Sequence, residues 1–328
     1  MSQEIALPFT VQSIGATYIC RSKIGTGATG DIYKTDCNHA LKLIPCSSIS
    51  PEEMYILTNV HHAHIIRALD FGVTQAKLST TKPGYRPFYY NFFVMPLGVQ
   101  TLYEMDLNIV PFAQRIKWIR QIYSALRHLY TLGHIHGDIH PKNVLLMPND
   151  DVVLIDFNLS YHIMDEDVSK SPTSTVPFCS PLSLLASSKP ETNKMYTKLL
   201  KGCTEPIGLK DQLKCDSFAF AQLVTYILFN GESFMHPVHT IDTVVFIEQY
   251  TANMVAYNSL GSQYVYDYLQ AMFEKYRIGD QLLFYCSNCC TSLNLLGLFH
   301  LLINCLRFKQ SDRMMIGLAP MLDVILSW

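Results

Sequence analysis

Two short polar sequences, each joined to an apolar run, constrain the fold of this chain more than any other feature. IHGDIHPKNVLL (135–146) places Asp138 five residues before Asn143, and VVLIDFNLS (152–160) places Asp156 directly after four apolar residues. Carboxylate and amide oxygens suit Mg²⁺, a hard ion. A further carboxylate can orient an attacking hydroxyl in phosphoryl transfer. Single Asp or Asn residues often only cap strands, but this ordered set predicts a phosphoryl-transfer site.

A glycine-rich stretch, IGTGATGDIYK, precedes these sequences and contains Gly25, Gly27 and Gly30. Glycine lets the backbone approach phosphate oxygens closely and adopt positive φ. A dinucleotide-binding fold would continue into a helix, whereas DIYKT is strand-like. The pattern favours a glycine-rich flap between two strands, with an ordinary hairpin turn as the alternative.

Lys42 stands in the middle of an apolar strand, HALKLI. Such a lysine either faces solvent or is buried and needs a partner. The following segment, PEEMYIL, begins with a proline suited to a first helical turn, and its register directs Glu53 toward the sheet. A Lys42–Glu53 pair that steadies phosphates is the functional interpretation.

The order of elements predicts a small β-rich portion followed by a larger helical portion, joined near residues 96–100. Period-2 and period-3.6 patterns indicate strands at 16–24, 31–35, 39–44, 65–71 and 89–97, and helices at 51–62, 115–130 and 216–230. The helix at 216–230 is apolar nearly all round, which predicts that it is buried.

Composition limits the function classes. Of 328 residues, 49% are hydrophobic and 16% charged, and the net charge of −2 gives no electrostatic basis for binding nucleic acid or a membrane surface. The N-terminus lacks the pattern of a secretory signal. The uncharged span 281–306 carries too many polar residues for a membrane helix and is expected to form a buried helical hairpin. We expect a reduced, intracellular, cytoplasmic protein, with a nuclear location as the alternative.

Ten cysteines in a chain of this length do not indicate a disulfide scaffold. Cys286, Cys289 and Cys290 could share a zinc ion, but no second Cys-x-x-Cys pair completes a four-ligand site.

Taken together and in this order, the motifs resemble those of eukaryotic-type protein kinases, over roughly residues 16–320. The resemblance implies an α+β, bilobal fold. A β-rich lobe with helix C would span 1–96, and a mainly helical lobe 97–328. ATP and Mg²⁺ would bind in the cleft between the lobes, and the γ-phosphate would be transferred to Ser or Thr of a protein substrate.

The resemblance also implies residue roles. Lys42, paired with Glu53, would contact the ATP phosphates, Asp138 would accept the substrate proton, and Asn143 and Asp156 would hold Mg²⁺. The implied nucleotide-binding residues, with Met95 as gatekeeper and 96–98 as the hinge, are Ile24, Gly25, Gly27, Gly30, Ile32, Ala40, Lys42, Met95, Leu97 and Asn143.

Three further positions match the family's pattern. Thr175, in STVPFCSPL, would support the catalytic aspartate, as in Ser/Thr kinases. Asp216 would bind the backbone of the catalytic loop, and Arg313 matches a late arginine of the large lobe. The literal Asp-Phe-Gly at Asp70 comes before the catalytic loop, so Asp156, in DFN, is the expected metal ligand.

Five positions depart from the family's pattern: Thr29, Gly137, His140, Asn158 and Leu182. Gly137 replaces an arginine that usually receives an activation-loop phosphate, so activity without such a phosphate is expected. His140 replaces a lysine, and because imidazole titrates near neutrality, activity should vary between about pH 6 and 7.5. Asn158 replaces a glycine and should tolerate left-handed backbone. Leu182 leaves Arg313 without its usual acidic partner.

Two other functions stay open. HGDIHPKN also resembles aminoglycoside and choline phosphotransferases, which act on small molecules, although these generally lack the flap and the STVPFCSPL segment. A pseudokinase scaffold would be expected to lack Lys42, Asp138 or Asp156, and all three are present.

DFNLS and the divergent SPL resemble herpesvirus-encoded protein kinases, which would place the protein in a host cell. The sequence predicts no oligomeric state.

Overall fold

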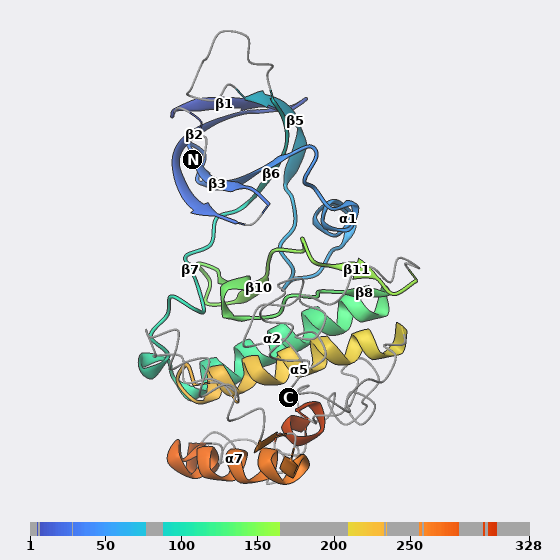
Figure 1. The fold of residues 1–328 in the computed structure, drawn as a ribbon. Helices are drawn as coiled ribbons and strands as arrows, with labels where there is room; N and C mark the ends of the chain where they lie inside the picture. The colour runs from blue at the N-terminus through green and yellow to red at the C-terminus, as the bar shows by residue number, and fades with distance from the viewer. Residues whose placement is uncertain are drawn as a thin grey trace. The chain divides into compact units, whose positions relative to one another are not determined.

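The computed structural model describes residues 5, 7–27, 29–76, 88–164, 209–232, 234, 256–257, 259–281, 298 and 301–306. The chain forms two compact units (Figure 1). Unit 1 comprises Met1–Gln100 and Leu145–Asn158, and unit 2 comprises Thr101–Val144 and Leu159–Trp328. The segment 145–158 belongs to unit 1 because Leu154 exchanges backbone hydrogen bonds with His64 (2.9 Å) and Ile66 (3.0 Å).

Unit 1 contains a six-stranded antiparallel sheet with the order β1-β2-β3-β4-β6-β5. Its strands are β1 (Phe9–Gln12), β2 (Thr17–Thr26), β3 (Asp31–Thr35), β4 (His39–Pro45), β5 (Asp70–Ala76) and β6 (Phe88–Pro96). Alternate residues of neighbouring strands, including Tyr33, Leu41 and Phe92, pack into one buried cluster. This period-2 burial is what the alternation of apolar side chains predicts for a sheet with one covered face.

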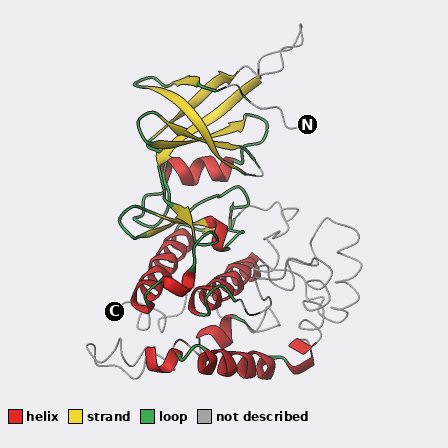
Figure 2. Cartoon of the chain, turned by 90° about the vertical axis from the view of Figure 1, so that its left-hand side faces the viewer, coloured by secondary structure: helices red, strands yellow, loops and turns green. Residues whose placement is uncertain are grey.

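Helix α1 (Pro51–Asn59) lies beside this sheet (Figure 2). It begins at an N-cap, Ser50, whose hydroxyl accepts the backbone N–H of Glu53 at 3.3 Å, and Pro51 occupies the first turn. The helix buries Glu53, Ile56 and Leu57, so the glutamate lies on the same face as the apolar residues.

Short strands hold the two polar sequences in place. β7 (Gln100–Thr101), β9 (Val144–Leu146) and β10 (Val152–Leu154) form one small sheet, and β8 (His134–Ile135) pairs with β11 (Tyr161–His162). Two 3₁₀ turns, η1 (Leu107–Ile109) and η2 (Pro141–Asn143), complete the loops. Asp156 therefore lies two residues after the end of β10, and Asp138 lies between β8 and η2.

Unit 2 is mainly helical in its described part, with α2 (Phe112–Thr131), α5 (Leu209–Leu228) and α7 (Ser262–Lys275). Helices α2 and α5 lie side by side (Figures 1 and 2). Residues 216–228 of α5 are all buried, as its uniformly apolar sequence predicts. No helix within the described ranges is long and apolar enough to cross a membrane. The predicted α+β fold class, a β-rich unit with a helical one, is confirmed.

Candidate active site

Lys42 forms two ion pairs inside unit 1. Its Nζ lies 2.6 Å from Oε1 of Glu53 and 2.9 Å from Oδ1 of Asp156. Burial alone would lower the pKa of Lys42, but the two carboxylates outweigh it and hold the pKa above its ordinary value. The lysine is thus a fixed, buried cation. Oε2 of Glu53 is buried and has no hydrogen-bond partner among the described residues, so the pair leaves acceptor capacity unused there.

Asp156 adopts left-handed backbone, with φ of 63°. This region is costly for most side chains, and aspartate tolerates it better than most. Asn158, which was expected to tolerate left-handed backbone, is not among the described residues with positive φ. The side chain of Asp156 keeps 25% of its surface exposed, so one side of the carboxylate is open to a ligand.

The predicted catalytic aspartate, Asp138, lies in unit 2 and is held by two side chains. Nδ2 of Asn143 donates to the backbone carbonyl of Asp138 at 2.9 Å and to its Oδ2 at 3.2 Å. Nε2 of His140 lies 3.2 Å from the same Oδ2. All three residues are buried, with 6–7% exposure. Their rotamers are therefore fixed by one another.

The tautomer of His140 follows from its other contact. Nδ1 of His140 accepts the backbone N–H of Lys142 at 3.2 Å, which makes His140 the N-cap of η2. A nitrogen that accepts a hydrogen bond carries no proton. The proton of the neutral ring is then on Nε2, which donates to Asp138. His140 stands where the family usually has lysine, and in the structure its ring contacts the carboxylate of Asp138.

Asp216 anchors the backbone of this loop, as the resemblance implied. Its carboxylate accepts the N–H groups of His136 at 2.8 Å and Gly137 at 3.0 Å. The hydroxyl of Tyr130 donates to it at 3.2 Å. Burial raises the pKa of Asp216 to about 7, although these hydrogen bonds oppose the rise. The contribution of Tyr130 was missed in the sequence; its only signal is its place at the end of the amphipathic helix before HIHGD.

Gly137 has a structural reason to be glycine. Its φ is +80°, and a Cβ there would lie 2.4 Å from the carbonyl oxygen of Leu159. The family's arginine could not be accommodated on this backbone without movement. The backbone conformation at residue 137 therefore accounts for glycine in place of the family's arginine.

Four of the predicted nucleotide-binding residues of unit 1 share one face of the sheet. Ile32 lies opposite Lys42, and Ala40 lies opposite Met95. Directly opposed residues share a face, and so do residues two apart in a strand. This face is the one opposite to the cluster that contains Tyr33 and Leu41.

The glycine flap forms a hairpin turn in which Gly27 N–H donates to Gly30 carbonyl at 2.8 Å. A Cβ on Gly30 would lie 2.3 Å from the Leu43 carbonyl oxygen, whereas added Cβ atoms at Gly25 and Gly27 make ordinary or slightly tight contacts. Packing against β4 accounts for Gly30. Ile24, before the flap, is 48% exposed, and Leu97 directly follows β6.

The aspartate of the literal Asp-Phe-Gly, Asp70, has a structural role at the start of β5. Its carboxylate accepts the hydroxyl of Tyr18 at 2.8 Å and the backbone N–H of Phe71 at 2.8 Å. Thr175, Leu182, Arg313 and the Cys286 cluster lie outside the described residues.

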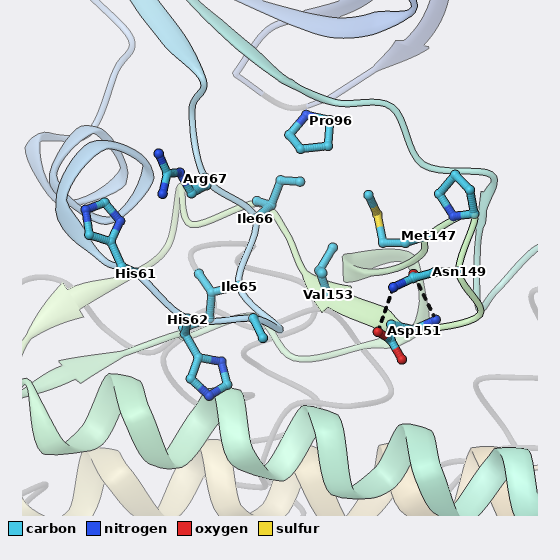
Figure 3. Close-up of a pocket in the computed structure, with 12 residues that line it drawn as sticks. His61, His62, Ile65, Ile66, Arg67, Pro96, Met147, Asn149, Asp151 and Val153 are labelled. Atoms are coloured by element: carbon cyan, nitrogen blue, oxygen red, sulfur yellow. Dashed lines mark hydrogen bonds between the residues drawn. The ribbon is translucent and has the colours of Figure 1, made fainter.

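A cavity of about 670 Å³ in the described part of unit 1 is separate from this chemistry (Figure 3). It is lined by His61, Arg67, Pro96, Met147 and Asp151, among others, and includes none of Lys42, Glu53 and Asp156. Of the predicted hinge it contains Pro96 alone. Asn149 donates to Asp151 at 2.8 Å on one wall.

Comparison with known proteins identifies the family. Residues 18–198, more than half of the chain, match the protein kinase domain. A probable serine/threonine-protein kinase KIN1 homolog of Enterocytozoon bieneusi is 30% identical over 135 residues, which are 40% of this chain and 21% of that protein. Mitogen-activated protein kinase 13 of Homo sapiens is 21% identical over 166 residues, 47% of this chain and 43% of that protein.

Serine/threonine-protein kinase RUNKEL of Arabidopsis thaliana is 24% identical over 157 residues, 46% of this chain and 11% of that protein. The chain thus spans less than half the length of these curated relatives. They come from cellular organisms, and the resemblance to viral kinases receives no support from them. The chain belongs to the protein kinase family.

Proposed function

We propose that this chain is a Ser/Thr protein kinase that transfers the γ-phosphate of ATP, with Mg²⁺, to hydroxyl groups of protein substrates. The observation that carries the proposal is the fixed cation of Lys42 between Glu53 and Asp156. A buried lysine held by two carboxylates is poised to bind phosphate oxygens as a point charge. The similarity to serine/threonine-protein kinases of Enterocytozoon bieneusi and Arabidopsis thaliana supports the choice of acceptor.

The residues present suit a magnesium nucleotide. Asn143 uses its Nδ2 for both hydrogen bonds to Asp138, which leaves Oδ1, the atom able to ligate a cation, for the metal. Asp156 gives Oδ1 to Lys42 and retains a second oxygen. Bound Mg²⁺ would neutralise charge on the phosphates. Asn143 and Asp156 would hold it, and Lys42 would bind the phosphates.

Asp138 would orient the substrate hydroxyl and accept its proton as the phosphoryl group is transferred. This requires a carboxylate in a fixed direction, because catalysis in this class is mostly positioning and charge stabilisation. The donors Nδ2 of Asn143 and Nε2–H of His140 both engage Oδ2 of Asp138. We assign His140 as a positioning residue for Asp138.

Independence from activation-loop phosphorylation is part of the proposal. The arginine that would bind such a phosphate is replaced by Gly137. A Cβ at residue 137 would clash with the carbonyl oxygen of Leu159 on the present backbone. Protein treated with a phosphatase should therefore retain its activity. Loss of all activity after the treatment would refute this part.

An intracellular, cytoplasmic location is also proposed, since ATP is an intracellular substrate.

The test of the main proposal is an assay with γ-labelled ATP, Mg²⁺ and mixed protein substrates, followed by identification of the labelled amino acid. Label on Ser or Thr that disappears in Asp138→Asn and Lys42→Met is expected. Asp70→Asn is the matched control, because Asp70 belongs to the Asp-Phe-Gly that precedes the catalytic loop and bonds only to structural partners in the described chain. It should keep full activity.

Two results would contradict a protein kinase. Asp138-dependent consumption of ATP with small hydroxyl compounds, and no label on protein, would assign a small-molecule phosphotransferase. ATP binding without turnover on any substrate would assign a pseudokinase scaffold.

A further inference from the structure

Lys142 is an exposed residue that lies next to the side chains that hold Asp138. Lys142 is the middle residue of η2, between Pro141 and Asn143. Its backbone N–H donates to His140 at 3.2 Å, and the next residue, Asn143, donates to Asp138. Both neighbours of Lys142 in this hydrogen-bond network thus touch the carboxylate that would receive the substrate.

The ammonium of Lys142 lies 4.5 Å from the centroid of the Tyr103 ring. This is within the range of a cation–π interaction, which fixes the position of a charge without neutralising it. Tyr103 is itself 49% exposed. The pair therefore presents an oriented positive charge at the surface of unit 2.

No acidic side chain in the described part of the chain forms an ion pair with Lys142, and its only described side-chain contact is the ring of Tyr103. Lys275, also in unit 2, differs, because its ammonium lies 2.7 Å from Oε1 of Glu232. Within the described part of the chain, no acidic side chain neutralises the charge of Lys142, which faces solvent.

We propose that Lys142, positioned by Tyr103, selects protein substrates that carry Asp or Glu within a few residues of the accepting hydroxyl. This rests on the proposed function, because a hydroxyl must be held at Asp138. Successive residues of an extended peptide are about 3.3–3.6 Å apart, and Lys142 follows Asp138 by four residues through a single tight turn. A carboxylate one to three residues from the acceptor comes within reach of the flexible lysine side chain.

The expected preference is modest, because the ammonium is exposed to water. Exposed ion pairs are screened and correspond to about a two- to five-fold effect on an equilibrium or rate. The effect should shrink as ionic strength rises. Such a preference selects among substrates while the transferred group and the reaction stay the same.

The experiment compares peptides that contain one serine and differ only in one flanking residue, Asp, Asn or Lys, at each of the three positions on either side. The readout is kcat/KM for the Asp peptide divided by that for the Asn peptide. In the wild-type chain this ratio should be about two to five at one or more positions. It should fall to about one in Lys142→Met, and Lys142→Glu should favour the Lys peptide instead.

Matched variants distinguish the effect of the charge at residue 142 from the effect of the net charge of the chain. Lys117→Glu makes the same charge change on the exposed face of α2 and should leave the ratio as in the wild type. Tyr103→Ala should reduce the ratio, and Tyr103→Phe, which keeps the ring face, should restore it.

A wild-type ratio of one at every position, with efficient labelling of the peptides, would overturn this inference alone. A ratio that persists in Lys142→Glu would overturn it as well. Absence of labelling on every peptide and on mixed proteins would overturn the proposed function, and the inference would fall with it.

Discussion

Nε2 of His140 donates to Oδ2 of Asp138 while Nδ1 of the same ring accepts the backbone N–H of Lys142. One imidazole therefore caps a short 3₁₀ turn and also orients the predicted catalytic carboxylate. A lysine, which the family usually has here, has donors only and cannot cap the turn. The two functions of His140 can be separated by substitution.

His140→Asn should keep the cap and lose the contact with Asp138. The asparagine oxygen can replace Nδ1 as the acceptor, but its side chain is too short to replace Nε2. We expect kcat to fall about ten-fold or more, because misplaced catalytic groups cost up to about 10²-fold. The free energy of unfolding, measured by urea denaturation, should stay within about 0.5 kcal/mol of the wild type.

His140→Ala is the comparison, because it removes both contacts. It should lose about 1 kcal/mol of stability in addition to activity, the usual cost of a lost N-cap. An unchanged kcat in His140→Asn would contradict the positioning role.

Gly137→Ala should destabilise the chain. The substitution forces a side chain onto left-handed backbone and places its Cβ 2.4 Å from the Leu159 oxygen. We expect a loss of about 1–3 kcal/mol or more in the free energy of unfolding. Thermal or urea denaturation measures it, with Gly15→Ala as the control.

Gly15 suits this purpose because an added Cβ would meet no atom within 4 Å and its φ is not left-handed. That control should be neutral within about 0.5 kcal/mol. Equal stabilities of the two variants would show that the loop moves freely to accept a side chain at 137.

The sequence predicted most of unit 1 because its strands alternate apolar and polar residues and are separated by turn residues. The strand His39–Pro45 falls where its pattern indicated, and the helix predicted at 51–62 begins at Pro51 and ends at Asn59. β1 (Phe9–Gln12) was not predicted, since FTVQ is only four residues long and its pairing with β2 is not visible locally. The strand expected at 65–71 begins only at Asp70, since Ile65 makes a single bridge to Leu154.

The candidate site was predicted by residue type and order, while its contacts were only partly predictable. The partner of Lys42 was expected to be Glu53, but Asp156, 114 residues away in sequence, also bonds to it. Helix α5 begins at Leu209 rather than at Asp216, because polar residues precede the apolar run that defined the pattern. Long-range contacts of this kind depend on tertiary packing, which no local pattern encodes.

Arg115→Met should destabilise unit 2 strongly. The guanidinium of Arg115, at the start of α2, donates to the carbonyls of Leu107, Val110 (3.1 Å) and Leu228 (3.3 Å) and to the side chain of Asn230. Burial lowers the pKa of Arg115 below its ordinary value. Methionine would leave several buried acceptors unpaired, at about 1–3 kcal/mol each.

Arg277→Met is the matched control, because that arginine is 78% exposed and pairs with Asp280 on the surface. It should change stability by less than about 1 kcal/mol. Chemical denaturation followed by tryptophan fluorescence reports both variants, since Trp118 is buried in α2. A small effect of Arg115→Met would show that water replaces the guanidinium.

Asp216 should make stability depend on pH. Burial raises its pKa from the ordinary 3.8 to about 7, and the charge of Asp138 adds to the rise. The folded chain then holds the proton more tightly than the unfolded chain. The contribution of Asp216 to the free energy of unfolding therefore falls as pH rises from about 4 to 7 and is constant above that range.

Asp216→Asn cannot ionise and provides the reference. Groups that titrate alike in both proteins cancel when the free energy of unfolding of the variant is subtracted from that of the wild type. This difference, measured by urea denaturation between pH 4.5 and 8, should decrease with pH by roughly 1–4 kcal/mol. An increase with pH would mean that the donors His136, Gly137 and Tyr130 outweigh burial. The carboxylate would then be ionised throughout, and its pKa would lie below the ordinary value.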